Sequence, residues 1–159
     1  MADLLAAHQG AACWATLFTH AHYLPGLAVL LQSMRACQTR YPLVVMVTET
    51  VDARTRERLA RMGCVLRDVD AWRVPHADGS LAFERFQNVW TKLRAFELYE
   101  YERVVMIDSD MLMCHNMDEL FDLPLERGMI AAAFACTCNP KQIPTYPAEW
   151  TPRNCGYAL

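Results

Sequence analysis

Two aspartates that follow an apolar stretch are the side chains best placed for chemistry in this sequence. Asp108-Ser109-Asp110 comes directly after residues 104–107, an apolar run typical of a buried strand. Two carboxylates at positions i and i+2, beside an apolar wall, can bind a hard divalent cation and leave room for phosphate oxygens. The same spacing also occurs in solvated turns, so the context of the pair must decide between the two interpretations.

A second pair of aspartates has the same spacing and shows how much that context matters. Asp68 and Asp70 follow Arg67 and a short apolar stretch, whereas Asp108 follows a longer run of apolar residues. We therefore interpret Asp68 as the end of a surface strand. The sequence predicts the cation site at Asp108 and Asp110.

Polar residues beside two other predicted elements could contact a nucleotide. Thr16, Thr19, His20 and Tyr23 lie at the end of the first predicted strand and the start of its helix, a usual position for a nucleotide. Lys92, one of two lysines against thirteen arginines, begins a later helix and could hold a phosphate near the metal. The alternatives are exposed loop histidines and a surface lysine. No glycine-rich loop follows the first strand, which excludes a dinucleotide fingerprint and a P-loop.

Alternating strand and helix patterns explain why these polar residues should meet. Apolar runs predict strands, and amphipathic patterns predict helices between them, with Leu93, Phe96 and possibly Tyr99 facing the core. This order predicts a three-layer α/β/α fold with a mainly parallel sheet, in which Asp108 and Asp110 follow an interior strand. The strands are expected at residues 13–19, 43–47, 64–66, 104–107 and 129–135, and the helices at 24–36, 53–62, 90–99 and, as a short turn, 117–121.

Individual residues mark where two of the helices should begin and end. Pro25 fits the first turn of the helix at 24–36, where its missing N–H costs nothing. Asp52 is a suitable N-cap for the helix at 53–62, and Gly63 a suitable stop.

Composition limits the function classes that remain open. The chain has 159 residues, of which 53% are hydrophobic, so it can bury the core of a single domain. Its formal charge of −3 argues against a general binder of nucleic acid or anionic membranes. No apolar run reaches the roughly 20 residues of a transmembrane helix. Seven scattered cysteines without zinc-site spacing suggest reduced thiols and a cytoplasmic protein.

Four segments together resemble the glycogenin and galactinol synthase family, glycosyltransferase family 8, whose members have the Rossmann-like GT-A fold. They are residues 14–19 with Tyr23, 90–93, 104–112 and 116–121, and residues 136–150 resemble the galactinol synthase branch in particular. The resemblance implies a metal-dependent retaining glycosyltransferase that uses Mn²⁺ to transfer a hexose from UDP-glucose or UDP-galactose to an acceptor, which stays unidentified.

The resemblance also implies roles for individual residues. Asp108 and Asp110 would bind Mn²⁺ and, with Ser109, the donor diphosphate, while Lys92 and Arg85 would contact the phosphates or the sugar. The uridine would lie against Leu17, Thr19, His20 and Tyr23, where His20 replaces the asparagine usual in the family.

The family completes its metal site with a histidine far downstream, and this sequence has no histidine beyond His115. We therefore expect residues 1–159 to form the donor-binding part of a larger GT-A domain, with exposed apolar surface that favours a homo-oligomer. Two alternatives stay open. One is a nucleotide-sugar-binding fragment without turnover, and the other is a phosphatase of the haloacid dehalogenase type, in which the first aspartate would be a nucleophile.

Overall fold

A computed structural model describes residues 12–72, 87–126 and 128–132 of the chain. The chain divides into two units, Met1–Leu123 and Pro124–Leu159, and the elements below belong to the first. No helix in the described ranges is long and apolar enough to cross a membrane.

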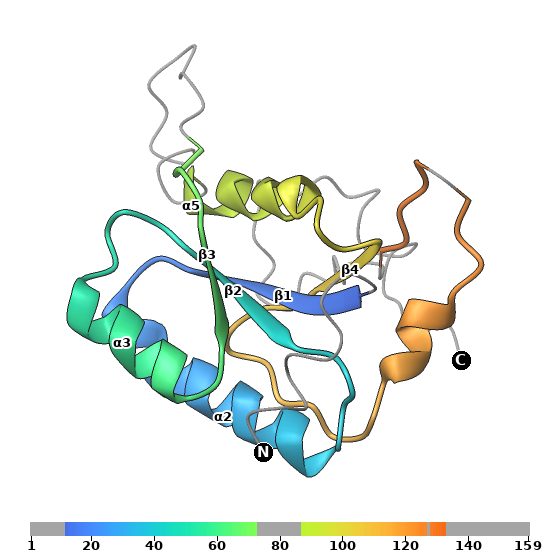
Figure 1. The fold of residues 1–159 in the computed structure, drawn as a ribbon, viewed down its shortest axis with the longest axis horizontal. Helices are drawn as coiled ribbons and strands as arrows, with labels where there is room; N and C mark the ends of the chain where they lie inside the picture. The colour runs from blue at the N-terminus through green and yellow to red at the C-terminus, as the bar shows by residue number, and fades with distance from the viewer. Residues whose placement is uncertain (1–11, 73–86, 127, 133–159) are drawn as a thin grey trace, which may run out of the picture. The chain divides into compact units, whose positions relative to one another are not determined.

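The first unit is built on a parallel four-stranded sheet. Its strands are β1 (Ala12–Phe18), β2 (Leu43–Val47), β3 (Val65–Asp68) and β4 (Arg103–Met106), in the spatial order β3-β2-β1-β4. All three strand pairs are parallel. The α/β fold class with a mainly parallel sheet is therefore confirmed (Figure 1).

The position of β4 corrects one expectation from the sequence. Among the described residues β4 has a single neighbour, β1, so it is an edge strand rather than the interior strand predicted for Asp108 and Asp110. All its residues are half-buried, whereas β2 is fully buried. The apolar run at 104–107 is what misled the prediction, because one buried face and one neighbour already favour apolar, β-branched side chains.

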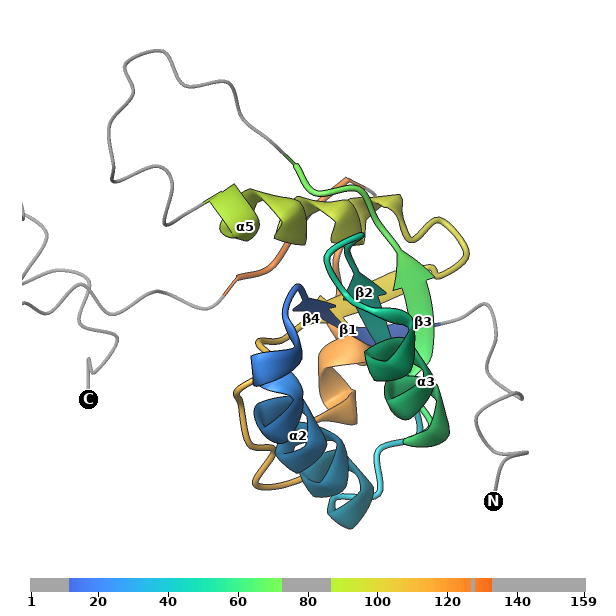
Figure 2. The ribbon, with the colours of Figure 1, turned by 90° about the vertical axis from the view of Figure 1, so that its left-hand side faces the viewer.

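Two helices cover one face of the sheet, as Figures 1 and 2 show: α2 (Leu24–Ala36) and α3 (Ala53–Arg61). The predicted boundary residues are confirmed, since Pro25 lies in the first turn of α2 and Asp52 caps α3 by accepting a hydrogen bond from the Thr55 N–H at 2.9 Å. The core on this face joins alternate residues of β1 to the helices, including Trp14, Phe18, Leu27, Leu30, Met34 and Leu59.

The opposite face carries a short α-helix, α5 (Gln87–Trp90), followed by a 3₁₀-helix, η2 (Thr91–Glu97). The prediction that Leu93, Phe96 and Tyr99 face the core is wrong, because all three are exposed. A 3₁₀-helix has three residues per turn, so side chains three apart lie in one row instead of drifting round an α-helix. Leu98, the residue after η2, packs on the sheet in a second core cluster with Cys13, Ala15, Val44 and Met46.

Two short 3₁₀-helices complete the unit, η1 (Ala21–Tyr23) before α2 and η3 (Asp118–Asp122) after β4. The strand predicted at 129–135 is not found in its described part, since residues 129–132 form no strand, and residues 133–135 lie outside the described ranges. Gly128 has a φ of 85°, and the Met129 N–H donates to the Glu126 carbonyl at 3.0 Å, so a turn precedes them. Met129 and Ile130 are exposed, and their apolar character alone does not indicate a strand.

Candidate functional site

The Asp108–Asp110 turn lies at the carboxyl end of β4, beside the end of β1. The last ladder contact is the Ile107 N–H, which donates to the Ala15 carbonyl at 2.9 Å. The Met111 N–H then donates to the Asp108 carbonyl at 3.2 Å and closes a tight turn. Asp108 and Asp110 are exposed and Ser109 is half-buried, so both carboxylates are accessible to a ligand.

The first turn of α2 packs directly against this turn. A Cβ atom added to Gly26 would lie 3.2 Å from the Ser109 carbonyl oxygen and 3.5 Å from the Asp110 Cα. The absence of a side chain at Gly26 therefore allows the helix to approach the backbone that carries the carboxylates. Sequence reasoning missed this glycine, although its position after Pro25 at a helix start was a usable signal.

Lys92 points from η2 to the same turn, where its ammonium group pairs with the Asp108 carboxylate. Two contacts fix the helix on either side of Lys92. The buried Thr91 hydroxyl accepts a hydrogen bond from the Trp72 N–H at 3.0 Å, and Arg94 donates to the Asp70 carbonyl at 3.2 Å. The structure therefore brings the predicted cation to the predicted carboxylates.

The residues after β1 form a small cluster of rings and hydroxyls. Thr19 is buried and its hydroxyl is 2.8 Å from His20 Nδ1. The rings of His20, His22 and Tyr23 lie together, with the centroids of His22 and Tyr23 4.0 Å apart. Tyr23 immediately precedes α2, so the cluster and the Asp108–Asp110 turn flank the same helix start. Leu17 is half-buried at the end of β1.

Two threonines after β2 belong to this edge and were not among the predicted site residues. The Thr50 hydroxyl donates to the Thr19 carbonyl at 2.6 Å and lies 2.7 Å from the Thr48 hydroxyl. Thr16, in β1 three residues before Thr19, has a buried hydroxyl without a hydrogen-bond partner among the described residues. The rule that chemistry follows the carboxyl ends of parallel strands points to Thr48 and Thr50 as directly as to Asp108.

The second aspartate pair is in a different place. Asp68 ends β3, the opposite edge strand, and Arg56 binds its carboxylate. The strand order puts three inter-strand spacings, about 14 Å, between β3 and β4. Arg56 also donates to the Thr48 and Val51 carbonyls, so Asp68 is part of a structural contact between α3 and the sheet. This is the surface strand end that the sequence predicts for Asp68.

The Asp108–Asp110 turn offers two carboxylates to a ligand. Within the described ranges, no group of three His, Cys, Asp or Glu side chains is arranged to hold a metal ion. Oxygen ligands are nevertheless what a hard divalent cation requires, and a diphosphate can supply the remainder. The donor set therefore fits a cation that binds together with a phosphorylated ligand. Arg85, the other predicted contact, lies outside the described residues.

The buried thiols are not candidates for nucleophiles. Burial raises the pKa of Cys13 to about 12, with a further increase from the nearby Glu100 carboxylate. Burial also raises the pKa of Cys64 to about 11, against a smaller opposite effect of Arg35. A thiol reacts as the thiolate, so both cysteines are inert packing residues.

Comparisons with known proteins identify the family of the chain. The model of the family described as glycosyl transferase family 8 matches residues 15–158. The chain is 32% identical over 117 residues to galactinol synthase 2 of Arabidopsis thaliana and, equally, to galactinol synthase 2 of Solanum lycopersicum, covering 74% of this chain and 34% of each relative. It is 30% identical over 140 residues to galactinol synthase 5 of Arabidopsis thaliana, covering 87% of this chain and 41% of that protein.

The chain spans about a third of the length of the two galactinol synthase 2 proteins and 41% of galactinol synthase 5. The matched region nevertheless includes most of β1, the Thr19–Tyr23 cluster, Lys92 and the Asp108–Asp110 turn. Since the family model covers most of the sequence, the chain belongs to glycosyl transferase family 8.

Proposed function

We propose that this chain forms the donor-binding part of a metal-dependent, retaining glycosyltransferase that moves a hexose from a UDP-sugar to an acceptor. The observation that carries the proposal is the convergence of Lys92, Asp108 and Asp110 beside the Thr19–Tyr23 cluster. A cation, two carboxylates and an aromatic platform at one sheet edge match the diphosphate, the metal and the base of such a donor.

Each part of the donor has a counterpart among the described residues. The carboxylates of Asp108 and Asp110 would hold Mn²⁺, which supplies charge neutralisation for the departing diphosphate when it is bound. The Lys92 ammonium group would contact a phosphate oxygen, after exchanging part of its contact with Asp108. Tyr23 offers a partly exposed ring for the uracil base, and Leu17 and Thr19 line the strand end beneath it.

The family match favours a glycosyltransferase over the phosphatase alternative. A phosphatase of the haloacid dehalogenase type would use Asp108 as a nucleophile, whereas the family model that matches residues 15–158 is one of glycosyl transferases. A second candidate function is donor binding without transfer. It rests on the same donor-side residues as the first.

The proposal is tested by calorimetric titration of the full chain with UDP in the presence and absence of Mn²⁺. We expect UDP to bind more tightly with Mn²⁺, and Asp108→Asn or Asp110→Asn to weaken the metal-dependent part by about 10–100-fold. Asp68→Asn is the matched control, since it removes a carboxylate of the same spacing on the opposite edge strand. Equal losses in all three variants, or UDP binding indifferent to Mn²⁺, would contradict the proposal.

Transfer and binding without transfer are separated by the products. The chain is incubated with Mn²⁺ and either UDP-glucose or UDP-galactose, and UDP release is followed with and without candidate hexitol or saccharide acceptors. Acceptor-dependent release of UDP supports the transferase. Tight binding of donor without any release supports the second candidate.

A further inference from the structure

The connection between β4 and η3, residues 107–117, runs along α2, as Figures 1 and 2 both show. It begins at the Asp108–Asp110 turn beside Gly26, in the first turn of the helix. It is held midway at Met113, whose N–H donates to the Ser33 hydroxyl at 3.0 Å. The Met113 carbonyl accepts from the Cys37 thiol at 3.3 Å, and the Met113 side chain is buried in the core.

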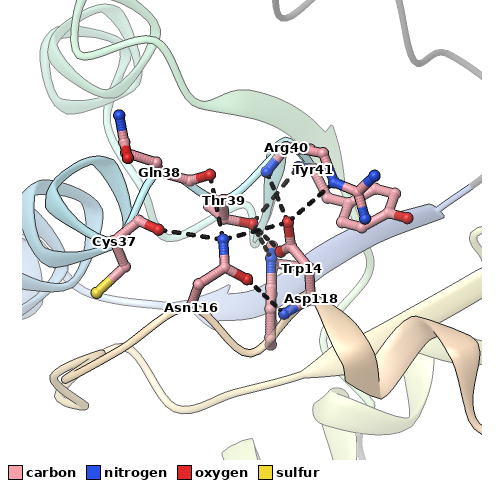
Figure 3. A network of polar contacts seen from close by, with 8 residues as sticks. All are labelled: Trp14, Cys37, Gln38, Thr39, Arg40, Tyr41, Asn116 and Asp118. Atoms are coloured by element: carbon pink, nitrogen blue, oxygen red, sulfur yellow. Dashed lines mark hydrogen bonds and ion pairs between the residues drawn. The ribbon is translucent and has the colours of Figure 1, made fainter.

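A network centred on Asp118 anchors the far end of the connection (Figure 3). The buried Asp118 carboxylate accepts hydrogen bonds from the Thr39 hydroxyl at 2.5 Å and from the Arg40 N–H at 3.0 Å. Trp14 donates its indole N–H to the same Thr39 hydroxyl at 2.8 Å. The Asn116 amide donates to the Cys37 carbonyl at 3.1 Å and the Gln38 carbonyl at 3.2 Å, at the end of α2.

The first half of the connection is short. Three peptide units join Asp110 to Met113, so they span at most about 10–11 Å. Both ends of this stretch contact α2, Asp110 beside Gly26 and Met113 at Ser33. A displacement of Met113 along the helix away from Asp110 is therefore passed on to the turn once the stretch is extended.

We infer that this connection positions the Asp108–Asp110 turn, with Ser33 as the positioning residue and the Asp118 network as the anchor that keeps Met113 against α2. The inference rests on the proposed function, because it assigns these residues a purpose in cation binding at the turn. Ser33 suits this role because its hydroxyl is buried and doubly engaged, donating to the Leu30 carbonyl at 2.7 Å while it accepts from Met113. The hydrogen bonds of Ser33 and Asp118 go to α2, to Met113 and to residues 39–40 and 116, so we assign neither residue a ligand contact.

A merely structural role would be different in one measurable respect. The Met111 N–H bonds to the Asp108 carbonyl inside the turn and touches neither Ser33 nor Asp118. If the connection only stabilises the fold, loss of Ser33 or Asp118 leaves exchange at this amide unchanged under conditions where the protein stays folded. If it positions the turn, the Met111 amide exchanges faster although its own acceptor is intact.

The experiment is residue-resolved amide hydrogen exchange on the full chain, followed by calorimetric titration with Mn²⁺ and UDP. The variants are Ser33→Ala, Asp118→Asn and Ser33→Thr, which keeps the hydroxyl. Asp52→Ala is the matched control, since it removes the cap of α3 and lowers stability away from the connection. All measurements are made well below the unfolding temperature of the least stable variant.

We expect faster exchange at Met111 and Mn²⁺ affinity reduced by about tenfold in Ser33→Ala and Asp118→Asn, with Ser33→Thr close to the wild type. Asp52→Ala should lower the melting temperature and change neither readout. Unchanged Met111 exchange in the first two variants, or an equal change in Asp52→Ala, overturns the inference. A third outcome is faster Met111 exchange in Ser33→Ala and Asp118→Asn together with a wild-type protein that binds no Mn²⁺. That outcome overturns the proposed function and supports the positioning of the turn.

Discussion

At the scale of single residues, Lys92 and Asp108 form an exposed ion pair. This exposure limits how much the pair contributes to the stability of the fold. Solvent-exposed pairs contribute about 0–1 kcal/mol to stability, because water screens them and both side chains lose freedom. The side chains of Thr91 and Arg94 fix the helix on either side of Lys92 through the backbone of residues 70 and 72. The fold is therefore expected to depend little on the ion pair itself, which leaves Lys92 available for the ligand contact proposed above.

Replacement of Lys92 by methionine should separate these two contributions. We expect Lys92→Met to change the free energy of unfolding by less than about 1 kcal/mol, since the ion pair is exposed. Binding of UDP should weaken several-fold, whereas binding of uridine, which has no phosphate, should stay unchanged. Calorimetric titration with both ligands measures the difference. Equal weakening of uridine and UDP would place Lys92 outside the phosphate site.

Asp118 links the stability of the protein to pH. Burial alone would raise its pKa, but the hydrogen bonds from Thr39, Arg40 and Asn116 outweigh burial and lower the pKa below its usual range. A carboxyl with a lowered pKa in the folded state stabilises the fold above its unfolded pKa of about 4, and this contribution is lost as the pH falls through the folded value.

We therefore expect Asp118→Asn to cost about 1–3 kcal/mol at pH 7 and less at pH 3, because pH 3 lies below the unfolded pKa of about 4 and the contribution of the charged form declines from there toward the lowered folded pKa. Urea unfolding of both proteins at the two pH values gives the difference. Asp122→Asn, on an exposed carboxyl of the same short helix, is the control and should stay within about 0.5 kcal/mol of the wild type at both values. A cost that is independent of pH would contradict the charged network.

At the scale of elements, the start of α2 joins the two halves of the candidate site. Tyr23 precedes the helix, Pro25 begins it, and Gly26 touches the Asp108–Asp110 turn. A methyl group at Gly26 would be tighter against the Ser109 carbonyl than ordinary contacts, although not prohibitively so. The helix itself would gain from alanine, because glycine is less favourable in a helix by roughly 0.5–1 kcal/mol.

These opposed effects predict a divergence between stability and binding in Gly26→Ala. We expect a melting temperature equal to or slightly above that of the wild type, together with several-fold weaker Mn²⁺-dependent binding of UDP. Thermal unfolding and calorimetry on the same sample measure both. The control is Ala28→Gly, two residues on in the same helix, which should lower the melting temperature and leave binding unchanged.

The elements that could be predicted from the sequence are those with local signals. β1 and β2 follow from apolar runs, and α3 follows from Asp52 before it and Gly63, with its φ of 86°, after it. The winding of η2 could not be predicted, because the contacts of Thr91 with Trp72 and of Arg94 with Asp70 help to hold it. The hydrophobic pattern at 90–99 fits an α-helix or a 3₁₀-helix. Tertiary contacts, which the sequence does not show, decide which of the two forms and therefore which side chains are exposed.

The same limit applies to the candidate site. Asp108, Asp110 and Lys92 could be named as candidates because they are chemically distinctive and lie near strand or helix ends. Ser33 was not found, because its partner Met113 is 80 residues away and a backbone N–H leaves no trace in the sequence.

At the scale of the whole molecule, the first unit exposes large apolar side chains in a row along α5 and η2. Trp90, Leu93 and Phe96 are all exposed and are spaced three residues apart. This spacing matches the three residues per turn of the 3₁₀-helix η2, in which Leu93 and Phe96 lie. Contiguous exposed apolar surface favours association. We therefore expect self-association that increases with protein concentration, as the sequence also suggested.

Substitution of Phe96 tests whether this row is responsible. Phe96→Glu should lower the concentration dependence of the sedimentation coefficient without changing stability by more than about 0.5 kcal/mol, since the ring is exposed. Val29→Glu is the control, because Val29 is comparably exposed on α2, which covers the opposite face of the sheet. Association that persists unchanged in Phe96→Glu would assign it to another surface.

The pairing of β4 with β1 has a consequence for the order in which the molecule assembles. The chain that separates these two strands is more than three times as long as the chain between β1 and β2, and closing it costs about 1 kcal/mol more in conformational entropy. β1, β2 and β3 pair with strands that are close to them in the sequence. β4 pairs with a strand that is distant in the sequence, and among the described strands it has one neighbour. We expect β4 to dock late in folding and to detach early in partial unfolding. Since Asp108 and Asp110 follow β4 while the Thr19–Tyr23 cluster follows β1, the ability to bind a cation would be acquired last and lost first.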